Sequence, residues 1–391
     1  MATAATSASP TRMSAVSDIE SSFDVSKSKR PAGKTRVEAF QVKPIPTPLR
    51  EPLKAALRGE PAAWPELSDE DVRTLVEHGV APLVYAAQPV EALRPAAIRA
   101  AAIEPSRAAD LQELLRELAA RGIEVLITKG TALAYDVYRA PELRPRGDVD
   151  LLVSRGDAER AVAAFRELGF ASKLTSGDEH AVRQVTLTRN GHEYDLHWDI
   201  ANSPLFAPAL QFESLLAGSI ALPRLGPDAR GLSHVDALLL ACIHRVAHHH
   251  DVERLIWLVD IVLLRERMSR EEHAEFWRRA AEARVVGVCV RSFELADEWG
   301  SGVFAPDSFL TQDELTRDEP SRAFLKDDLR YGDVMLANLR ALPWPARIQR
   351  LWQLAFPPRA FMRATLGDGL LPWLYAKRGA RGVQRLFRRM L

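Results

Sequence analysis

Two aspartates separated by one residue, Asp148 and Asp150, open the stretch of this 391-residue sequence that is best suited to chemistry. They begin the run DVDLLV, which ends at Val153 and has the composition of a strand, and side chains at positions i and i+2 of a strand point to the same face. Adjacent carboxylates repel each other, and Mg²⁺, which prefers carboxylates together with phosphate oxygens, relieves that repulsion. The pair therefore predicts a metal site, with solvated acids at a strand entrance as the alternative.

A third acid, Asp195, is expected to join this pair. The dipeptide Asn190-Gly191 is typical of a two-residue hairpin turn, and it connects the predicted strands Gln184–Arg189 and His192–Trp198. In the second of these strands apolar positions alternate with polar ones, and Asp195 is on the polar side. The sequence therefore predicts one metal centre that all three acids share.

A candidate phosphate site precedes the two aspartates. The apolar run from Ile123 to Ile127 fits a buried strand, Lys129 and Gly130 interrupt it, and the segment from Thr131 to Tyr138 has the composition of a short helix. Backbone N–H groups and a hydroxyl at a helix N-terminus favour an anion. Gly130 and Thr131 are therefore candidates to contact a triphosphate, with a plain turn as the alternative.

Together these motifs resemble the signature of the uncharacterised nucleotidyltransferase family, within the polymerase-β-like superfamily. The resemblance rests on four short stretches, which are Lys129-Gly130-Thr131, Arg144, Asp148 to Val153, and Tyr194 to Trp198. It extends over residues 65–375. The superfamily usually has Gly-Ser in the turn where this chain has Gly130-Thr131, and Thr offers the same hydroxyl. Gly147 stands where a Ser often precedes the first Asp.

The resemblance implies an α/β (α+β) fold in which helices flank a mixed sheet, and the transfer of a nucleotidyl group from an NTP with release of pyrophosphate. It implies two Mg²⁺ ions, which Mn²⁺ could replace, held by Asp148, Asp150 and Asp195 as metal ligands and catalytic residues. One ion would lower the pKa of an acceptor hydroxyl and the other would hold the triphosphate. Asp195 would hold mainly the first ion and could act as general base.

Several basic residues near the acids are candidates for phosphate contact. Lys129 either reaches a phosphate of the NTP or is a solvated lysine at a strand end. Arg144, and with weaker support Arg146, either neutralises phosphate charge or lies on the surface of the loop from Pro141 to Gly147. The expected NTP-binding residues are accordingly Lys129, Gly130, Thr131 and Arg144.

A histidine cluster invites a second metal site. Its members are His244, His248, His249 and His250, on and after one predicted helix. No HExxH motif and no cysteine pair supports zinc there, so we expect a packing or acceptor-side role. His197 is expected to support Asp195.

Composition bounds the class of protein. The 52 basic and 52 acidic residues give a formal net charge of zero, which disfavours a long nucleic acid as acceptor. Two cysteines in apolar helical contexts, Cys242 and Cys289, read as buried free thiols, which fits a cytoplasmic protein. No apolar run is long enough to span a membrane, and no secretory signal is evident, so a soluble protein is expected.

Four regions are expected along the chain. They are a disordered tail and linker (1–48), an N-terminal helical region (49–121), the nucleotidyltransferase core (122–200) and a helical C-terminal domain on the acceptor side (201–391). Ser68 and Asp71 are a plausible cap of one N-terminal helix. Pro105-Ser106 is expected to separate two others.

The last helix has a cluster of basic residues, which are Lys377, Arg378, Arg381, Arg385, Arg388 and Arg389. A solvated terminal helix is the favoured interpretation, and contact with anionic lipid or an anionic acceptor is the alternative.

The sequence therefore favours a Mg²⁺-dependent nucleotidyltransferase. The acceptor would offer a hydroxyl or a phosphate and could be a small molecule, a glycan intermediate, a peptide or a protein. A non-catalytic nucleotide- or partner-binding protein on the same fold is the main alternative. A hydrolase built on the histidine cluster is a third hypothesis.

Overall fold

The structure is a computed structural model, and it describes residues 42–172, 184–200, 203–249, 251–300, 318–326, 331–356 and 369–390, together with residues 329, 362, 366 and 367. Residues 1–41, for which a disordered tail is expected, and His250 lie outside these ranges.

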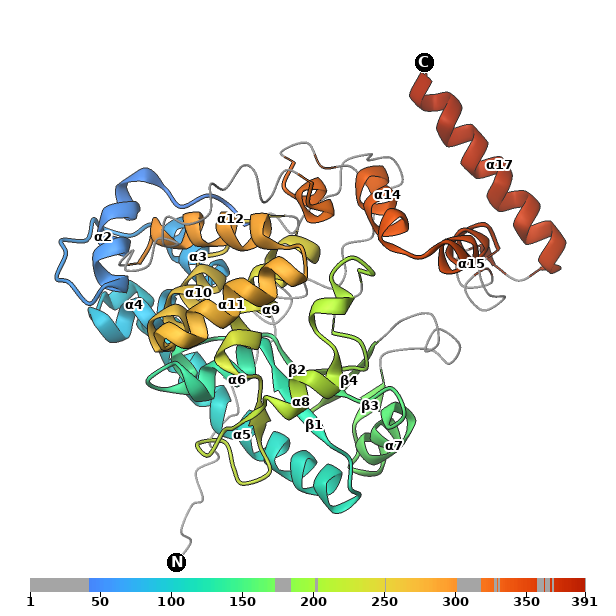
Figure 1. The fold of residues 1–391 in the computed structure, drawn as a ribbon. Helices are drawn as coiled ribbons and strands as arrows, with labels where there is room; N and C mark the ends of the chain where they lie inside the picture. The colour runs from blue at the N-terminus through green and yellow to red at the C-terminus, as the bar shows by residue number, and fades with distance from the viewer. Residues whose placement is uncertain are drawn as a thin grey trace, which may run out of the picture.

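Helices come before, within and after a central sheet (Figure 1). Before it run α2 (Thr47–Leu57), α3 (Asp69–Glu77), α4 (Ala81–Ala87) and α5 (Arg94–Ala120). Between the strands lie α6 (Lys129–Asp136), α7 (Ala158–Glu167) and α8 (Phe212–Ala217). After it come α9 (His234–Ala247), α10 (Leu255–Arg267), α11 (Arg270–Glu282), α12 (Val286–Asp297), α14 (Tyr331–Ala341), α15 (Trp344–Ala355) and α17 (Leu371–Met390).

Seven strands form one mixed sheet in the order β3-β4-β5-β2-β1-β7-β6. They are β1 (Val125–Thr128), β2 (Asp148–Val153), β3 (Ala171–Ser172), β4 (Gln184–Arg189), β5 (His192–His197), β6 (Ile220–Ala221) and β7 (Arg230–Gly231). The central strand β2 pairs antiparallel with β1 and parallel with β5. The predicted mixed α/β fold is confirmed.

The sheet is covered on both faces, and the pleat of β2 assigns each of its side chains to one of them. Val149 and Leu151 belong to an apolar cluster with α5 and α7. Leu152 belongs to the other cluster, which contains α2–α4 and α9–α12. Since Asp148 and Asp150 share the face of Leu152, the two carboxylates point toward the C-terminal helices.

The hairpin that carries Asp195 forms as predicted. Asn190 and Gly191 both have positive φ, 51° and 78°, which the two-residue turn between twisted strands requires. The turn fixes the register of β4 and β5, so that Thr186 lies opposite Asp195.

The N-terminal helices confirm one expectation and correct another. Ser68 and Asp71 form the predicted capping box at the start of α3. The prediction that Pro105 separates two helices is wrong, because α5 continues through it. Glu104 and Arg107, on either side of the proline, are buried and bond to residues around β2, so tertiary contacts hold the helix across a residue that lacks a donor.

The segment after Asp199 was expected to be a loop that leads into helices, but it contains two strands. Its two short strands, β6 and β7, form an antiparallel pair, and β7 adds to the sheet parallel to β1. Strands of two residues have no hydrophobic period, so the sequence pattern does not reveal them. Among the described residues no helix is long and apolar enough to cross a membrane.

Candidate active site

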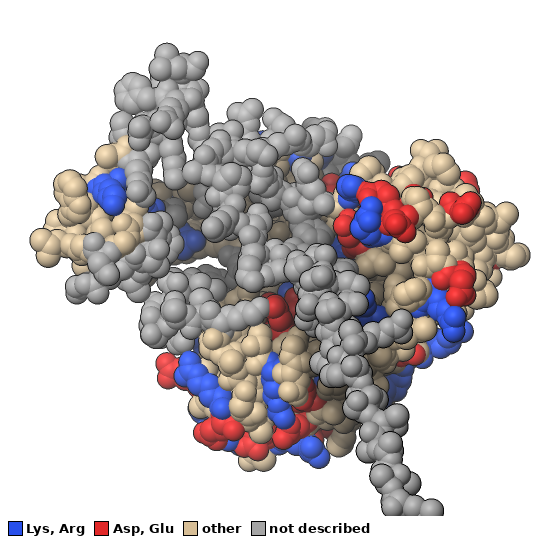
Figure 2. Space-filling view, turned by 180° about the vertical axis from the view of Figure 1, so that it is seen from behind, with Lys and Arg blue, Asp and Glu red and all other residues tan. Residues whose placement is uncertain are grey.

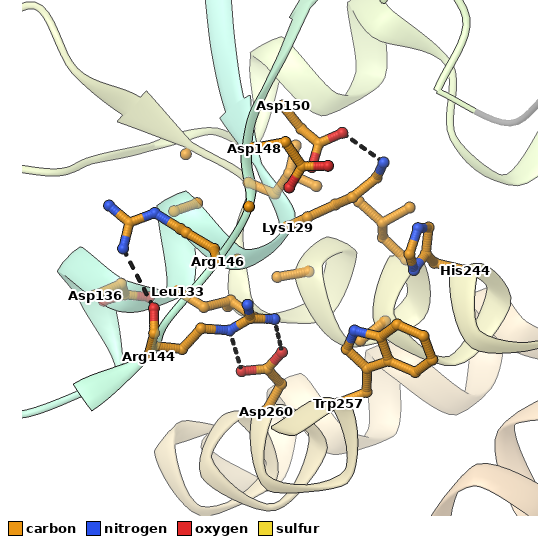
Figure 3. Close-up of a pocket in the computed structure, with 18 of the residues that line it drawn as sticks. Lys129, Leu133, Asp136, Arg144, Arg146, Asp148, Asp150, His244, Trp257 and Asp260 are labelled. Carbon is orange, nitrogen blue, oxygen red and sulfur yellow. Dashed lines mark hydrogen bonds and ion pairs between the residues drawn. The ribbon is translucent and has the colours of Figure 1, made fainter. Parts of the chain in front are cut away.

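The three predicted acids lie on adjacent strands. In the parallel pairing of β2 with β5, Asp150 is directly opposite Asp195. One ligand atom from each of Asp150, Asp195 and His197 lies within 4.8 Å of the others, which is close enough for a shared metal ion. Asp148 is outside this group, although its carboxylate adjoins that of Asp150 (Figure 3).

Asp150 is the centre of the charge arrangement. The Nζ of Lys129 donates to its Oδ1 at 2.6 Å, and Nε2 of His197 lies 3.0 Å from the same oxygen. Burial alone would raise the pKa of Asp150, but Lys129 and His197 outweigh it and hold this pKa below its usual value. The expectation that His197 supports Asp195 is thus corrected, because its hydrogen-bond partner is Asp150.

The backbone of Lys129 has a strained conformation. It begins α6 with φ of 53°, a conformation that few residues other than glycine adopt. Burial disfavours its charged form, yet the charge of Asp150 raises its pKa overall. Lys129 is therefore an ammonium ion held against the carboxylates, which were the expected partners of a metal.

Asp148 has the opposite shift. It stands at the exposed entrance of β2, yet the protein around its carboxyl group and the negative charge of Asp150 raise its pKa to about 6, against the opposing effect of Lys129. One lysine therefore does not compensate the carboxylates fully. A divalent cation fits this donor set, because carboxylate oxygens are the ligands that Mg²⁺ and Mn²⁺ prefer and an imidazole also suits Mn²⁺.

Gly130 and Thr131 have different positions at the start of α6. Gly130 lines the cavity beside the acids. Thr131 is buried behind it, and its hydroxyl accepts a hydrogen bond from Nε of Arg146 at 3.0 Å. Arg146 also donates to Glu104, so it belongs to a buried network between α5 and α6.

Arg144 has a partner that the sequence did not reveal. Its Nε and Nη2 donate to the two oxygens of Asp260, at 3.2 and 2.6 Å (Figure 3). The hydroxyl of Tyr138 also donates to Asp260, at 2.7 Å. Burial would lower the pKa of Arg144, and Asp260 more than reverses that effect. The one available signal was an acid inside the apolar run of α10, since a buried charge needs a partner.

A cavity of about 170 Å³ extends from the acids to the C-terminal helices. Lys129, Asp148 and Asp150 lie along one part of its wall (Figure 3). The opposite part comes from α9, α10 and the segment between them and includes His244, His249, Arg254 and Trp257. Sequence reasoning missed Arg254 and Trp257, which precede or begin an apolar helix and match no motif.

The histidines of this wall pack on one another and on an aromatic ring. The ring centroid of His244 lies 5.0 Å from that of His248 and 4.7 Å from that of His249. The ring of His249 packs against Trp257 at a tilt of 32°, with the centroids 4.2 Å apart. Burial, followed by the charge of Lys129, lowers the pKa of His244 well below its usual value and that of His248 to about 3. Among the described residues, the group that could hold a metal ion consists of Asp150, Asp195 and His197. The packing or acceptor-side role of the histidines stays a prediction.

The two cysteines are buried and free, as predicted.

The comparisons with known proteins bear on this site. The sequence profile of the uncharacterised nucleotidyltransferase family matches residues 68–301, more than half of the chain, and includes all three acids. The chain belongs to this family. The protein is thus an enzyme of the nucleotidyltransferase class, as the sequence resemblance predicted.

No curated protein matches the chain. Among solved structures, it is similar to the structure titled "Solution Structure of Antibiotic-Resistance Factor ANT(2'')-Ia Reveals Substrate-Regulated Conformation Dynamics". The identity is 12%, the match covers 47% of this chain and 95% of that chain, and the TM-score is 0.34. A likeness of this size carries no argument about substrate or mechanism.

Proposed function

We propose that this enzyme transfers a nucleoside monophosphate from an NTP to an acceptor hydroxyl or phosphate and releases pyrophosphate, with Mg²⁺ as cofactor. The observation that carries the proposal is the meeting of Asp150, Asp195 and His197 within 4.8 Å, on the sheet face that the C-terminal helices cover. The family supplies the reaction class, and the arrangement supplies residues suited to it.

Asp148, Asp150 and Asp195 are the proposed metal ligands, and His197 orients Asp150 through its 3.0 Å contact. When bound, a divalent ion would neutralise negative charge on the phosphates and on the acceptor oxygen. Thr186 donates to Oδ1 of Asp195 at 2.6 Å and so fixes this carboxylate. We propose Asp195 as the group that accepts the acceptor's proton while the acceptor oxygen bonds to the α-phosphorus and the bond to the β-phosphate oxygen breaks.

Lys129 and the backbone of Gly130 are the proposed contacts of the triphosphate. Both line the cavity next to Asp148. Arg144 lines the same cavity, but its charge is paired with Asp260, so we propose that it shapes this wall and contributes its field to the phosphates. Thr131 supports the turn through Arg146.

We propose that the helices that follow the core bind the acceptor. Residues from α9 and α10 form the wall opposite the acids, and they include aromatic and basic side chains. A cavity of this size suits part of a small molecule or an exposed group of a larger one better than a long nucleic acid.

The test is the thermal stability of wild type and Asp150→Asn with each NTP, with and without Mg²⁺. Saturating ligand at about 100 times its dissociation constant adds roughly 2.7 kcal/mol. We expect a Mg²⁺-dependent rise in Tm for the wild type that Asp150→Asn loses. Asp199→Asn, an acid near the same hairpin but outside the site, is the matched control and should keep the rise.

Two outcomes would count against the proposal. No shift with any NTP would contradict nucleotide binding. A shift without release of pyrophosphate in the presence of candidate acceptors would favour the non-catalytic nucleotide-binding protein.

A further inference from the structure

Helices α15 and α17 have apolar side chains in contact with solvent. Trp344, Trp352 and Trp373 are 65% to 67% exposed, and Ile348 and Leu351 are 51% and 48% exposed. Three of the eight tryptophans of the chain are therefore solvent-exposed in this short stretch. Burying large apolar side chains is favourable, so a concentration of exposed ones indicates a contact surface.

The spacing of these residues places them on one side of α15. Trp344, Ile348, Leu351 and Trp352 follow the i, i+4, i+7, i+8 pattern of a single helical face. Arg347 borders this face: its guanidinium lies 5.9 Å from the ring centroid of Trp344. It donates to the backbone oxygens of Leu339, Arg340 and Leu342, at and just after the end of α14. Beyond this contact at its edge, the four apolar side chains of the face are 48% to 66% exposed.

The two helices are joined through an aromatic contact. Phe356, at the end of α15, lies 4.4 Å from Trp352 and 5.6 Å from Tyr375 of α17, measured between ring centroids. The pair projects from the body of the molecule beyond α14 (Figure 1). From behind, the body shows acidic and basic residues side by side (Figure 2).

The part of the chain that contains α15 and α17 is also strongly basic. Residues 340–391 contain 11 of the 52 basic residues and only one acidic residue, Asp368. This stretch therefore has a formal net charge of +10, and residues 1–339 have −10. The zero net charge of the whole chain conceals this asymmetry. The sequence of α17 contains no acidic residue. Its apolar residues Val383, Leu386, Phe387 and Met390 are spaced three or four apart, or adjacent, as on one face of a helix.

We propose that α15 and α17 together form a surface that docks on an anionic lipid membrane. We call it the C-terminal surface, and it consists of the exposed apolar residues Trp344, Ile348, Leu351, Trp352 and Trp373 with the basic residues that the sequence supplies along α17. Tryptophan is enriched at the level of lipid headgroups, and a helix with one apolar and one basic side lies in the membrane plane.

Charge complementarity selects this occupant over two others. A second copy that docked through the same surface would bring two positive stretches against each other. The face of the body seen in Figure 2 offers acidic residues beside basic ones, so it would repel the stretch as well as attract it. A polyanionic nucleic acid would satisfy the arginines, but it would leave the aliphatic side chains Ile348 and Leu351 in water. An anionic bilayer accepts both groups, because headgroups pair with arginines and the acyl boundary takes the apolar face.

The experiment is co-sedimentation of the full-length chain with vesicles of phosphatidylcholine alone and of phosphatidylcholine mixed with phosphatidylglycerol. We expect binding only to the anionic vesicles, a decrease in binding with salt, and a blue shift of tryptophan fluorescence. Arg385→Gln with Arg388→Gln should weaken binding by about fivefold for each charge removed. Trp344→Ser with Trp373→Ser should weaken it by about tenfold for each side chain.

Matched controls lie on the body of the molecule. Ile98, which is 56% exposed on α5, provides the apolar control Ile98→Ser, and Arg278 on α11 provides the charge control Arg278→Gln. Both should bind vesicles as the wild type does. Since the substituted tryptophans are exposed, circular dichroism and the nucleotide-dependent Tm rise should be unchanged in all variants.

Three results would overturn the proposal. The first is the absence of binding to anionic vesicles, and the second is binding that the controls reduce as much as the surface variants do. The third is binding to another partner without binding to vesicles. That partner could be a single-stranded or duplex RNA oligonucleotide, or a second copy of the chain, seen as concentration-dependent self-association in light scattering. Membrane docking and nucleotidyl transfer are tested by separate measurements, so the failure of one leaves the other standing.

Discussion

The guanidinium of Arg144 and the carboxylate of Asp260 form a two-point ion pair between residues 116 positions apart in the sequence. The pair joins the loop before β2 to helix α10, and both side chains are buried. It thereby couples the acids of the sheet to the opposite wall of the cavity.

Breaking this pair should be costly. Asp260→Asn leaves the buried charge of Arg144 without a counter-ion, and we expect a loss of about 3–5 kcal/mol in the free energy of unfolding. Tyr138→Phe, which removes one hydrogen bond to the same carboxylate, should cost about 1 kcal/mol. Urea denaturation measures both. In the double variant Arg144→Met/Asp260→Leu much of the stability should return, and a double variant as unstable as Asp260→Asn would contradict this interpretation.

Gly130 should not tolerate a side chain. A Cβ at this position would lie 2.5 Å from Nη1 and 2.7 Å from Cζ of Arg144, whose guanidinium cannot move away without leaving Asp260. We expect Gly130→Ala to lower stability by about 1–3 kcal/mol and to reduce nucleotidyl transfer. Gly147→Ala is the matched control, because a Cβ there meets no atom within 4 Å, and its stability should stay within about 0.5 kcal/mol of wild type. Equal losses in the two variants would refute the packing argument.

Replacement of Lys129 should increase the effect of Mg²⁺ on stability. Lys129→Met removes the ammonium ion that lies 2.6 Å from Asp150 and leaves the acids without a fixed cation. The variant should therefore gain a larger rise in Tm than the wild type when Mg²⁺ replaces EDTA. Lys54→Met, on the distant helix α2, should respond as the wild type does. A smaller Mg²⁺ effect in Lys129→Met would show that the lysine assists metal binding instead of substituting for it.

His78 should make the fold sensitive to acid. Burial lowers its pKa to about 4, against the raising effect of the backbone oxygen of Lys43, and its Nδ1 accepts from the backbone N–H of Leu255. The imidazole is therefore neutral in the fold, while the unfolded chain takes up a proton below pH 6.5. The contribution of His78 is complete above pH 6.5 and is lost as the pH falls toward 4, by up to about 3 kcal/mol.

The measurement for His78 is a difference between two proteins. His78→Gln should be less stable than wild type at pH 7.5, and the gap between the two unfolding free energies should narrow as the pH falls from 6.5 to 4. A gap that stays constant over this range would exclude His78 as the titrating group.

Local signals allowed the sheet and its acids to be predicted. The alternation in DVDLLV places Asp148 and Asp150 on one face, and Asn190-Gly191 fixes the hairpin that brings Asp195 opposite Asp150. Each of these inferences needs only residues that are neighbours in the chain.

Contacts between residues that are far apart in the sequence could not be predicted from these local patterns. Nothing near His197 indicates that it bonds to Asp150 instead of Asp195, because the choice depends on how two strands pair. Pro105 has the local character of a helix end, and only the buried contacts of its neighbours Glu104 and Arg107 keep α5 continuous. Asp260 needed a buried partner, but its distance from Arg144 in sequence concealed which one.

The strand β7 has a consequence for how the enzyme can be divided. It pairs with β1 and comes from the chain beyond Asp199, so a fragment that ends at residue 200 would contain all three acids but would leave the N–H and C=O groups of β1 open along one edge. The same fragment would lack Asp260 and would leave Arg144 charged in an apolar setting. We therefore expect a fragment that holds the three acids but ends at residue 200 to aggregate, and a minimal active piece to require the chain through α10.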